Sequence, residues 1–453
     1  MSTFFAEIVV DSYQDPARQL FTYRIPENMA GSLKEGSRVT VPFGKRVVEG
    51  SVWGISDRRP PFPTKDILEI KGLGFGKTQI ELAKWMVKHY LASPRECLSC
   101  QTGEKGSKTA TAAPDKITTL VLVPYASQVK LRALAEKQNN ALIGSRSAVF
   151  AQLPHLKRII IEEPENWNYK DERTPYYHAA EVAQKRAELE NLEIELHYQT
   201  PRVEDVKMGV KISPVKPVKV VDLGREKLAG NFTFVSAPME TALSSGKYSL
   251  VYVNSRELRE GVSEELRKIN LDKNLYKVVG PELFALPGQE YFHTIWADVD
   301  TLLNLPDFRA HEKIVWTVQN LNKITRGKLF LQTSSPENPL FKELVGGRLD
   351  SFYQRELENR EELSFPPFST LIKLSYSAKS STKVYQEAEG LNEKIQGIEY
   401  KVSSPYEPYA KTPGKVQLNL VVKIKLGDLA GLAKLAKVIP PDWKVEVDPE
   451  SLL

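Results

Sequence analysis

The sequence contains little cysteine and little histidine, with two and six residues of these types among 453. So few cysteines exclude a disulfide-stabilised chain and indicate a reducing compartment, so we expect the cytoplasm. Cys97 and Cys100 form a C-x-x-C pair. A structural zinc site needs four ligands and the sequence has no second cysteine pair, so two ordinary cysteines are the simpler interpretation.

Long apolar runs are also missing from the sequence. The runs at 120–123 and 159–161 are far shorter than the ~20 residues that span a bilayer. The apolar stretch near the N-terminus contains Glu7 and Asp11, and no basic leader precedes it. We therefore expect no membrane segment and no signal peptide.

Neither sign of charge dominates, because 62 Lys and Arg face 57 Asp and Glu for a net charge of +5. Charged residues at 26% and hydrophobic residues at 41% are typical of soluble globular proteins, which excludes bulk disorder, collagen and coiled-coil rods. The small basic excess is compatible with a nucleic-acid partner. A length of 453 residues suggests about three domains.

The first hundred residues combine short strands with one helix. Apolar or alternating segments separated by Gly, Pro and Asn predict strands at 5–10, 20–25, 38–43, 47–55 and 67–70. Helical periodicity then predicts a helix at 78–91. This pattern predicts a small β-barrel-like domain at 1–100.

Strands and helices alternate in the middle of the chain. The segment 101–116, rich in Gly, Ser, Thr, Ala and Lys, predicts a linker. After it we expect strands at 118–123, 141–143, 158–161, 193–197, 249–253 and 328–332, and helices at 127–137 and 176–190. This alternation predicts an α/β fold with parallel sheets, which we divide into 117–205 and 206–345.

The last part of the chain, 346–453, has a different element order. The pattern predicts strands at 370–376, 399–403, 416–425 and 443–447 and helices at 382–395 and 429–438. The order βαββαβ predicts a ferredoxin-like α+β domain.

Two segments are similar to phosphate-binding loops but depart from them. The segment 72–78 reads G-x-x-x-G-K-T, one residue shorter than the loop whose backbone amides surround phosphates, and 103–109 lacks a glycine before Lys108. We interpret the first as a turn and the second as part of the linker. Glu162 and Glu163 follow a buried-type strand, where α/β sheets hold Mg²⁺, but a solvated acidic turn is the simpler interpretation.

Basic residues interleaved with aromatic ones are the stronger signal. In the first domain these residues are Phe21, Tyr23, Phe43, Lys45, Arg46 and Lys65. In the last domain the lysines Lys411, Lys415 and Lys423 lie near Tyr406 and Tyr409. Small barrels hold single strands by stacking bases on aromatic rings and contacting phosphates with Lys and Arg. We therefore predict nucleic-acid contacts in both domains, with a solvated basic face as the alternative for the last one.

Several short motifs, found in one order along nearly the whole chain, carry a resemblance to a known family. They include F-T-Y-R-I-P at 21–26, V-P-F-G at 41–44, G-S-R-S-A-V-F-A at 144–151, L-P-D-F-R-A-H-E at 305–312 and F-P-P-F at 365–368. With these motifs the chain resembles a shortened member of the primosomal replication-restart helicases, the PriA family (primosomal protein N′). The resemblance implies an N-terminal 3′-DNA-binding domain, two reduced RecA-like helicase lobes and a C-terminal DNA-binding domain.

The resemblance also implies roles for single residues. Phe21, Tyr23 and Lys65 match the family's pocket for the 3′ end of a DNA strand, whereas Thr22 stands where the family has an aspartate. Arg146 belongs to the G-S-R-S-A run and is expected to contact DNA. Glu162 and Glu163 occupy the Walker B position in a degenerate form.

Departures from the family are equally informative. No Walker A loop precedes the strand at 118–123, the arginine-finger box Q-x-x-G-R-A-G-R reads Q-N-L-N-K-I-T-R at 319–326, and the cysteine-rich zinc module expected after 251–254 is missing. Phosphoryl transfer needs a phosphate cradle, a Mg²⁺ carboxylate and a transition-state cation together. We therefore expect no catalytic residues, no ATP hydrolysis, and neither zinc nor ATP with Mg²⁺ as a cofactor.

The expected function is binding of forked, single-stranded or 3′-ended DNA in replication restart and primosome assembly, in the cytoplasm at the nucleoid. Single-strand-binding protein and other replisome proteins are candidate partners. Two alternatives stay open. One is a divergent ATP-dependent 3′–5′ helicase in which Lys77 or Lys108 supports nucleotide binding, and the other is a structural adaptor for replisome proteins without DNA contact.

Overall fold

The computed structural model describes residues 4–11, 20–102, 116–135, 140–269, 271–285, 288–398, 400–409 and 413–453. The chain forms two compact units. Unit 1 comprises Met1–Pro124, Gln138–Leu196 and Thr370–Pro449, and unit 2 comprises Tyr125–Lys137, His197–Ser369 and Glu450–Leu453. Among the described helices, none is long and apolar enough to cross a membrane. The predicted linker lies almost entirely outside the described residues, and so does the G-x-x-x-x-K segment at 103–109.

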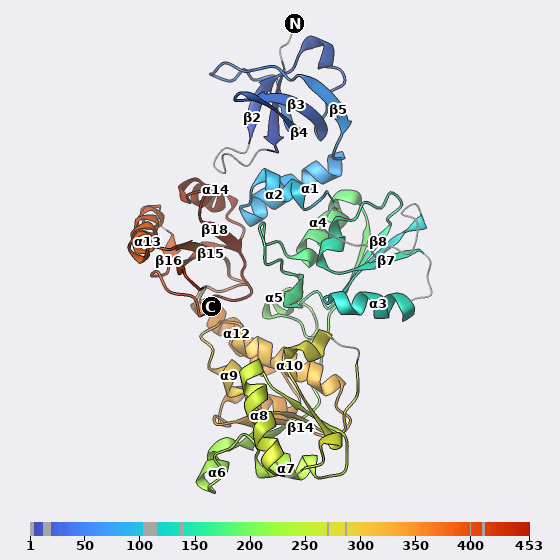
Figure 1. Ribbon diagram of the computed structural model, residues 1–453, viewed down its shortest axis with the longest axis vertical. Helices are drawn as coiled ribbons and strands as arrows, with labels where there is room; N and C mark the ends of the chain where they lie inside the picture. Colours follow the sequence, from blue (N-terminus) through green and yellow to red (C-terminus); the bar gives the residue numbers. More distant parts are fainter. Residues whose placement is uncertain are drawn as a thin grey trace. The chain divides into compact units, whose positions relative to one another are not determined.

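Unit 1 begins with a five-stranded antiparallel sheet (Figure 1). Its strands are β1 (Phe5–Val10), β2 (Phe21–Arg24), β3 (Ser37–Phe43), β4 (Arg46–Ser56) and β5 (Glu69–Leu73), in the order β2-β1-β4-β3-β5. A 3₁₀ turn, η1 (Glu27–Met29), follows β2. Alternate strand residues such as Ile8, Val39 and Val52 are fully buried in one core. The predicted strands are thus confirmed.

Backbone hydrogen bonds link the edge strand β2 to β3 through the segment 65–68. The amide of Arg24 donates to the Lys65 carbonyl (2.9 Å), and the amide of Ile67 donates to the Arg24 carbonyl (3.1 Å). The amide of Leu68 then donates to the Thr40 carbonyl of β3 (2.9 Å). This segment therefore covers backbone groups of β2 that an open edge would leave exposed to other chains.

The glycine-rich segment 72–76 connects β5 to helix α1 (Lys77–Tyr90). The amides of Gly74 and Phe75 both donate to the carbonyl of Gly36, at 2.9 and 3.0 Å. Gly36 has a φ of +84°, and a Cβ there would lie 2.0 Å from the Phe75 carbonyl oxygen. The predicted turn is confirmed, since these amides bind protein backbone. Helix α1 follows as predicted, with Ile80, Leu82, Ala83, Met86 and Tyr90 buried.

A second sheet of unit 1 is built from strands that alternate with helices. Its strands are β6 (Thr119–Leu122), β7 (Ala141–Gly144), β8 (Arg158–Glu162) and β9 (Glu193–His197), in the order β7-β6-β8-β9. Strand β6 pairs in parallel with both β7 and β8, as predicted. The accompanying helices are α2 (Pro94–Ser99), η3 (Arg146–Phe150), η4 (Trp167–Tyr169) and α4 (Ala179–Glu190). The predicted helix at 176–190 starts later because Tyr176 has a φ of +51°.

The third sheet of unit 1 contains β15 (Ser369–Ala378), β16 (Lys401–Val402), β17 (Val416–Lys425) and β18 (Lys444–Val447), in the order β16-β17-β15-β18. Helix α13 (Ser381–Gln396) follows β15, and α14 (Leu429–Val438) follows β17, so the chain order is βαββαβ. Alternate residues of β17, namely Leu418, Leu420, Val422 and Ile424, lie in the core.

Unit 2 contains a parallel sheet covered on both faces. Its strands are β10 (Lys219–Asp222), β11 (Ser249–Tyr252), β12 (Tyr276–Val279), β13 (Thr294–Trp296) and β14 (Leu329–Thr333), in the order β10-β14-β13-β11-β12. Leu250 and Tyr252 face a core that includes α10 (Ala310–Lys323) and α12 (Asp350–Glu362). Val251 and Val253 face the opposite core, with α7 (Ala237–Leu243) and α8 (Arg256–Lys268).

The remaining helices of unit 2 are α3 (Ala126–Ala135), α5 (Val203–Lys207), α6 (Leu223–Leu228), α9 (Asp300–Leu303), α11 (Pro339–Gly346) and the 3₁₀ turns η5 (Lys273–Leu275) and η6 (Pro281–Ala285). Helix α12 also belongs to unit 2. Part of the predicted domain 346–453 thus belongs to unit 2, because Phe352 and Tyr353 of α12 are buried in the core on one face of the parallel sheet.

Four charged residues of unit 2, Glu204, Arg309, Glu312 and Arg360, form what we call the ion cluster. Arg309 contacts Glu204 (Nη2 to Oε1, 2.6 Å) and Glu312 (Nη1 to Oε2, 2.9 Å). Arg360 of α12 contacts Glu312 (3.1 Å) and Glu204 (3.4 Å). Phe308 stacks on Phe365, with ring centroids 4.9 Å apart. The motifs at 305–312 and 365–368 therefore contact each other, and the ion cluster links α12 to α10.

Candidate nucleic-acid interface

Two phenyl rings meet at one end of the N-terminal sheet. Phe21 begins β2 and Phe43 ends β3, and their ring centroids are 4.9 Å apart at an interplanar angle of 84°. Both side chains are half-buried at the margin of the core. The structure thus brings together two predicted residues that are more than twenty positions apart, and part of each ring remains accessible.

Tyr23 lies on the same side of β2 but deeper in the sheet. It is 5% exposed, and its hydroxyl donates a hydrogen bond to the Pro42 carbonyl (3.1 Å). Burial raises the pKa of Tyr23 above its ordinary value. Tyr23 therefore anchors the end of β3 next to Phe43, and its ring is covered by the core.

Three exposed cations, Lys45, Arg46 and Lys65, lie near the end of β3 that carries Phe43. Lys45 lies in the turn between β3 and β4, where Gly44 has a φ of +60°, and Arg46 is the first residue of β4, opposite Phe43 in the register. The Lys65 ammonium donates a hydrogen bond to the Gly44 carbonyl (3.3 Å), which holds this lysine beside the turn. Aromatic rings beside Lys and Arg are the combination that small nucleic-acid-binding domains use.

An ion pair that the sequence analysis missed fixes the segment that carries Lys65. Arg24 contacts the Asp66 carboxylate through two nitrogens, at 2.5 and 2.6 Å. The Arg24 hydrogen bond is the main reason that the pKa of Asp66 is lowered. The two residues are 42 positions apart, and no local signal pairs them. Thr22, which stands where the family has aspartate, pairs with Glu7 across β1 and β2.

The two predicted Walker B glutamates lie at the end of β8 and in the turn that follows it. Glu162 ends the strand, and its carbonyl accepts a hydrogen bond from the Tyr169 hydroxyl (2.8 Å). Glu163 has a φ of +51°, and its carboxylate accepts a hydrogen bond from the Asn166 side chain (3.2 Å). Within the described ranges there is no group of three or more His, Cys, Asp and Glu that could hold a metal ion.

The lysine of the shortened glycine segment points to solvent. The Lys77 side chain is 88% exposed and lies 3.8 Å from the carboxylate of Glu81, one turn later in α1. It follows a segment whose Gly74 and Phe75 amides are bound to Gly36. This arrangement is a helix surface pair, and the nearby backbone amides have other partners.

Arg146 has partners inside unit 1. Its Nη1 donates to the Lys170 carbonyl (2.9 Å), and its Nε lies 3.5 Å from the Asp171 carboxylate. The side chain is 30% exposed, whereas that of Asp171 is 7% exposed. The guanidinium therefore fastens the segment after η4 to the start of η3, so most of its hydrogen-bonding capacity serves the fold.

The predicted lysines of the third sheet lie on and before β17. Lys415 is exposed, and Lys423 stands directly opposite Lys401 in the β16–β17 register. Burial and the charge of Lys401 lower the pKa of Lys423. Like charges in directly opposed positions repel each other across a sheet. Lys411 lies outside the described residues.

The comparisons with known proteins concern both the first domain and the chain as a whole. Residues 7–102 match the family model described as 3'DNA-binding domain (3'BD). Replication restart protein PriA of Bacillus subtilis is 23% identical over 440 aligned residues, which cover 71% of this chain and 54% of that protein. The protein of the same name from Thermotoga maritima is 22% identical and covers 69% of this chain and 56% of its own length.

A third relative is more similar over a shorter stretch. Replication restart protein PriA of Synechocystis sp. is 34% identical over 137 residues, which cover 25% of this chain and 16% of that protein. The chain spans about half the length of the first curated relatives it matches. Among solved structures, S. cerevisiae Dbp5 bound to RNA and ADP BeF3 covers 64% of this chain and 98% of its own at 9% identity and a TM-score of 0.33, which is a weak similarity.

Proposed function

Because this chain is a member of the PriA family of replication restart proteins, we propose that it binds forked or 3′-ended DNA during replication restart and does so without hydrolysing ATP. The N-terminal sheet holds the 3′ end of a strand beside Phe21, Phe43 and Lys65. One observation carries the proposal. The residues that match a 3′-DNA-binding domain, 7–102, include an accessible pair of phenyl rings with three cations beside it.

The energetics of this cluster favour a single strand. A base stacked on an aromatic ring gains about 1–3 kcal/mol, and two half-buried rings offer edges and faces for such contacts. Each lysine or arginine that neutralises a phosphate releases counterions and adds to the salt dependence of binding. Lys65 is held by Gly44 next to the rings, so one strand can contact both groups at its end.

The lysines of the third sheet supply a second DNA contact in this proposal. Lys415, Lys423 and the neighbouring Lys425 lie on or before one strand, and Lys401 stands opposite Lys423, so four lysines gather in this part of the sheet. Two linked weak sites can raise overall affinity by 10²–10⁴ when both engage one ligand. We further propose that the N-terminal sheet is a barrel-like domain, that the two parallel sheets are reduced RecA-like lobes, and that the third sheet of unit 1 is a ferredoxin-like domain.

The proposal that the chain does not hydrolyse ATP rests on the residues that ATP hydrolysis would require. Phosphoryl transfer needs a phosphate cradle, a carboxylate for Mg²⁺ and a cation at the transition state. The amides of Gly74 and Phe75 bind Gly36, the Glu163 carboxylate accepts from Asn166, and Lys77 pairs with Glu81. We propose that the α/β parts serve as a scaffold, that the protein acts at the nucleoid, and that single-strand-binding protein and other replisome proteins are its partners.

Fluorescence anisotropy with labelled forks tests the DNA-binding proposal. The wild-type chain should bind a fork with a free 3′ end more tightly than the same fork with a 3′-phosphate. Lys65→Ala should remove that preference and weaken binding to the free end about tenfold, the loss expected for one charge-assisted contact. The slope of affinity against salt should fall by about 0.7.

Lys77→Ala is the matched control, since it removes one exposed lysine from the same domain. It should leave fork binding within twofold of wild type, roughly the effect of a surface charge outside the site. Equal affinity of wild type and Lys65→Ala for the free 3′ end would overturn the proposed site. A phosphate-release assay with fork DNA tests the second part, and ATP turnover that Lys77→Ala abolishes would overturn it.

A further inference from the structure

Three segments of unit 2 meet just before the strands β11, β13 and β14. The amide of Phe292 donates to the Tyr248 carbonyl (2.8 Å), and the amide of Arg326 donates to the Tyr291 carbonyl (2.9 Å). The amide of Tyr291 in turn donates to the Ile324 carbonyl (2.7 Å). The side chains at this edge are therefore carried by a hydrogen-bonded backbone, which limits their movement relative to one another.

Gly327 allows this close approach. A Cβ at Gly327 would lie 2.7 Å from the Phe292 carbonyl oxygen and 3.2 Å from the Phe292 ring. Only a residue without a side chain fits there, so the segments containing Phe292 and Arg326 run side by side.

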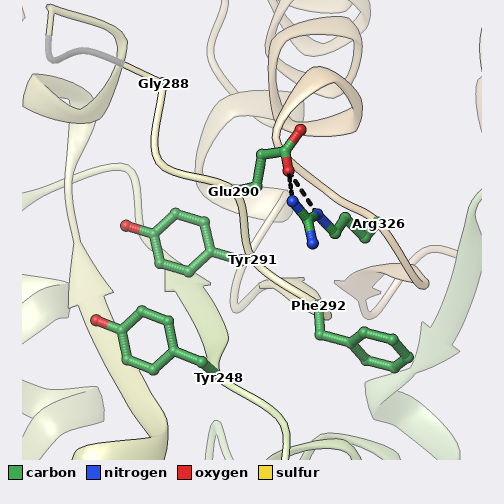
Figure 2. A pocket seen from close by; sticks show the side chains of 6 residues that line it. All are labelled: Tyr248, Gly288, Glu290, Tyr291, Phe292 and Arg326. Atoms are coloured by element: carbon green, nitrogen blue, oxygen red, sulfur yellow. Dashed lines mark hydrogen bonds and ion pairs between the residues drawn. The ribbon is translucent and has the colours of Figure 1, made fainter.

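A cavity of about 460 Å³ opens at this edge, lined by Tyr248, Gly288, Glu290, Tyr291, Phe292 and Arg326 (Figure 2). The rings of Tyr248 and Tyr291 are stacked, with centroids 5.5 Å apart and an interplanar angle of 26°. Tyr291 is buried, whereas Tyr248 and Phe292 are 37% and 38% exposed. A buried ring therefore supports an exposed ring, which gives a rigid aromatic platform at the protein surface.

Basic side chains surround the platform. Arg326 forms an ion pair with Glu290 on the opposite side of the cavity from the tyrosines (Figure 2). The Lys247 ammonium lies 5.2 Å from the Phe292 ring centroid. A guanidinium has five N–H donors and Glu290 engages only two of the nitrogens, so Arg326 retains donors for a further anion.

The charge balance of the three segments is basic. Lys247, Lys323, Arg326 and Lys328 are present in 244–249, 288–293 and 323–328, and Glu290 is the one carboxylate among these residues. An aromatic platform with excess positive charge suits a ligand that is flat in one part and anionic in another. A nucleotide of a single strand has both parts.

The cavity lies at the opposite end of the sheet from the place where a motor domain binds its nucleotide. It lies before the strands, at their amino ends, whereas α/β sheets bind ligands outside the carboxyl ends of their strands. Arg326 is the last residue of the segment 319–326, which resembles the family's arginine-finger box. In this chain it lines the cavity, with its guanidinium directed at Glu290 (Figure 2).

We propose that this cavity binds one unpaired base of single-stranded DNA, stacked on Tyr248, with the adjacent phosphate at Arg326 and Lys247. The inference rests on the proposed DNA binding and adds a contact that belongs to unit 2 alone. A single strand is favoured over a peptide because the exposed rings of Tyr248 and Phe292 lie beside the cations Arg326 and Lys247.

Photo-cross-linking of the full chain tests the proposal. The probe is an oligothymidylate of about 16 nucleotides with 5-iododeoxyuridine at internal positions and a 3′-phosphate, so that no free 3′ end is offered. Irradiation followed by peptide mass spectrometry should locate cross-links at one of the two exposed rings, Tyr248 or Phe292. Tyr248→Ala should weaken binding of this probe about tenfold, and Tyr248→Phe should retain it because the ring is kept.

Phe232→Ala is the matched control, because Phe232 is an aromatic residue of the same unit that is 78% exposed and lies outside the cavity. It should leave binding and cross-links unchanged. Binding of the probe without cross-links to Tyr248 or Phe292, or with unchanged affinity in Tyr248→Ala, overturns the cavity site, and a protein ligand then becomes the better occupant. Because the probe lacks a free 3′ end, the cross-linking result does not depend on the N-terminal 3′-end site. The two proposals can therefore fail independently of each other.

Discussion

Replacing Glu312 by glutamine tests the ion cluster of unit 2. The side chain is 11% exposed, and its Oε2 accepts from Arg309 (2.9 Å) and from Arg360 (3.1 Å). Its Oε1 accepts from the Val203 amide (2.7 Å). A glutamine can keep the Val203 bond through its carbonyl oxygen, but its NH₂ group then faces two guanidinium groups. Glu312→Gln thus leaves two buried arginines with one carboxylate fewer.

The expected loss of stability follows from these contacts. Two hydrogen bonds between charged groups contribute about 1.5–3 kcal/mol each, and removing one partner of a buried ion pair costs about 3–5 kcal/mol. We therefore expect Glu312→Gln to lower the free energy of unfolding of unit 2 by about 3–5 kcal/mol. The exposed Glu362, at the end of α12, is the matched control, and Glu362→Gln should change stability by less than about 0.5 kcal/mol.

Urea denaturation combined with hydrogen exchange measures this difference. Exchange of the α10 and α12 amides reports on unit 2 separately from unit 1, which a global signal does not. Glu312→Gln should speed exchange in both helices and lower the urea midpoint, and Glu362→Gln should do neither. The reasoning is refuted if the two variants and the wild type unfold at one urea concentration.

The same residue predicts a pH dependence. Burial by itself raises the pKa of Glu312, but the charges of Arg360, Arg309 and Arg202 outweigh burial and hold the pKa well below its usual range. A depressed folded-state pKa means that the stabilisation is present above the unfolded-state value of about 4.3 and is lost as pH falls. The difference between wild type and Glu312→Gln should therefore be full near neutral pH and shrink below about pH 4.

Two further predictions concern unit 1. Gly36→Ala should destabilise it by about 2 kcal/mol or more, because Gly36 has a φ of +84° and a Cβ would lie 2.0 Å from the Phe75 oxygen; Gly31→Ala, with open space around the Cβ, is the control in urea denaturation. Burial, followed by the charge of Glu181, raises the pKa of Asp448 to about 6, so ionising Asp448 costs stability as pH rises through that value. Asp448→Asn should therefore raise the melting temperature near about pH 8 and not near about pH 3, below the unfolded-state pKa of about 3.9, and an equal shift at both would contradict the assignment.

The secondary structure of unit 1 was largely predictable because burial imposes its period on the sequence, whereas within residues 197–369 of unit 2 only the strands β11 and β14 were predicted. Strand β17 and helix α14 occupy the predicted residues 416–425 and 429–438. In β17 every second side chain enters the core, and in α1 the buried residues recur at helical spacing. The prediction was less accurate where a backbone angle decides the boundary, as at Tyr176 before α4.

The sequence predicted which residues belong to the candidate DNA-binding site, but it did not predict which of them contact one another. Phe21, Phe43 and Lys65 were named from the sequence, and the structure brings them to one end of a sheet. Tyr23 was named with them, yet its ring packs into the core, because Tyr23 lies deeper in the sheet than Phe21 on the same face of β2. The Arg24–Asp66 pair joins residues 42 positions apart, which no periodicity reveals.

The sequence by itself determined the element order of the first and last domains, the alternation of strands and helices between them and the departures from phosphate-binding loops, since these depend on local periodicity and spacing. Only the tertiary structure decided that the motifs at 305–312 and 365–368 meet in the ion cluster and that Tyr248, Tyr291 and Arg326 share one cavity. The physical reason is the register of parallel strands. It aligns the starts of β11, β13 and β14 at one edge although long stretches of chain separate them.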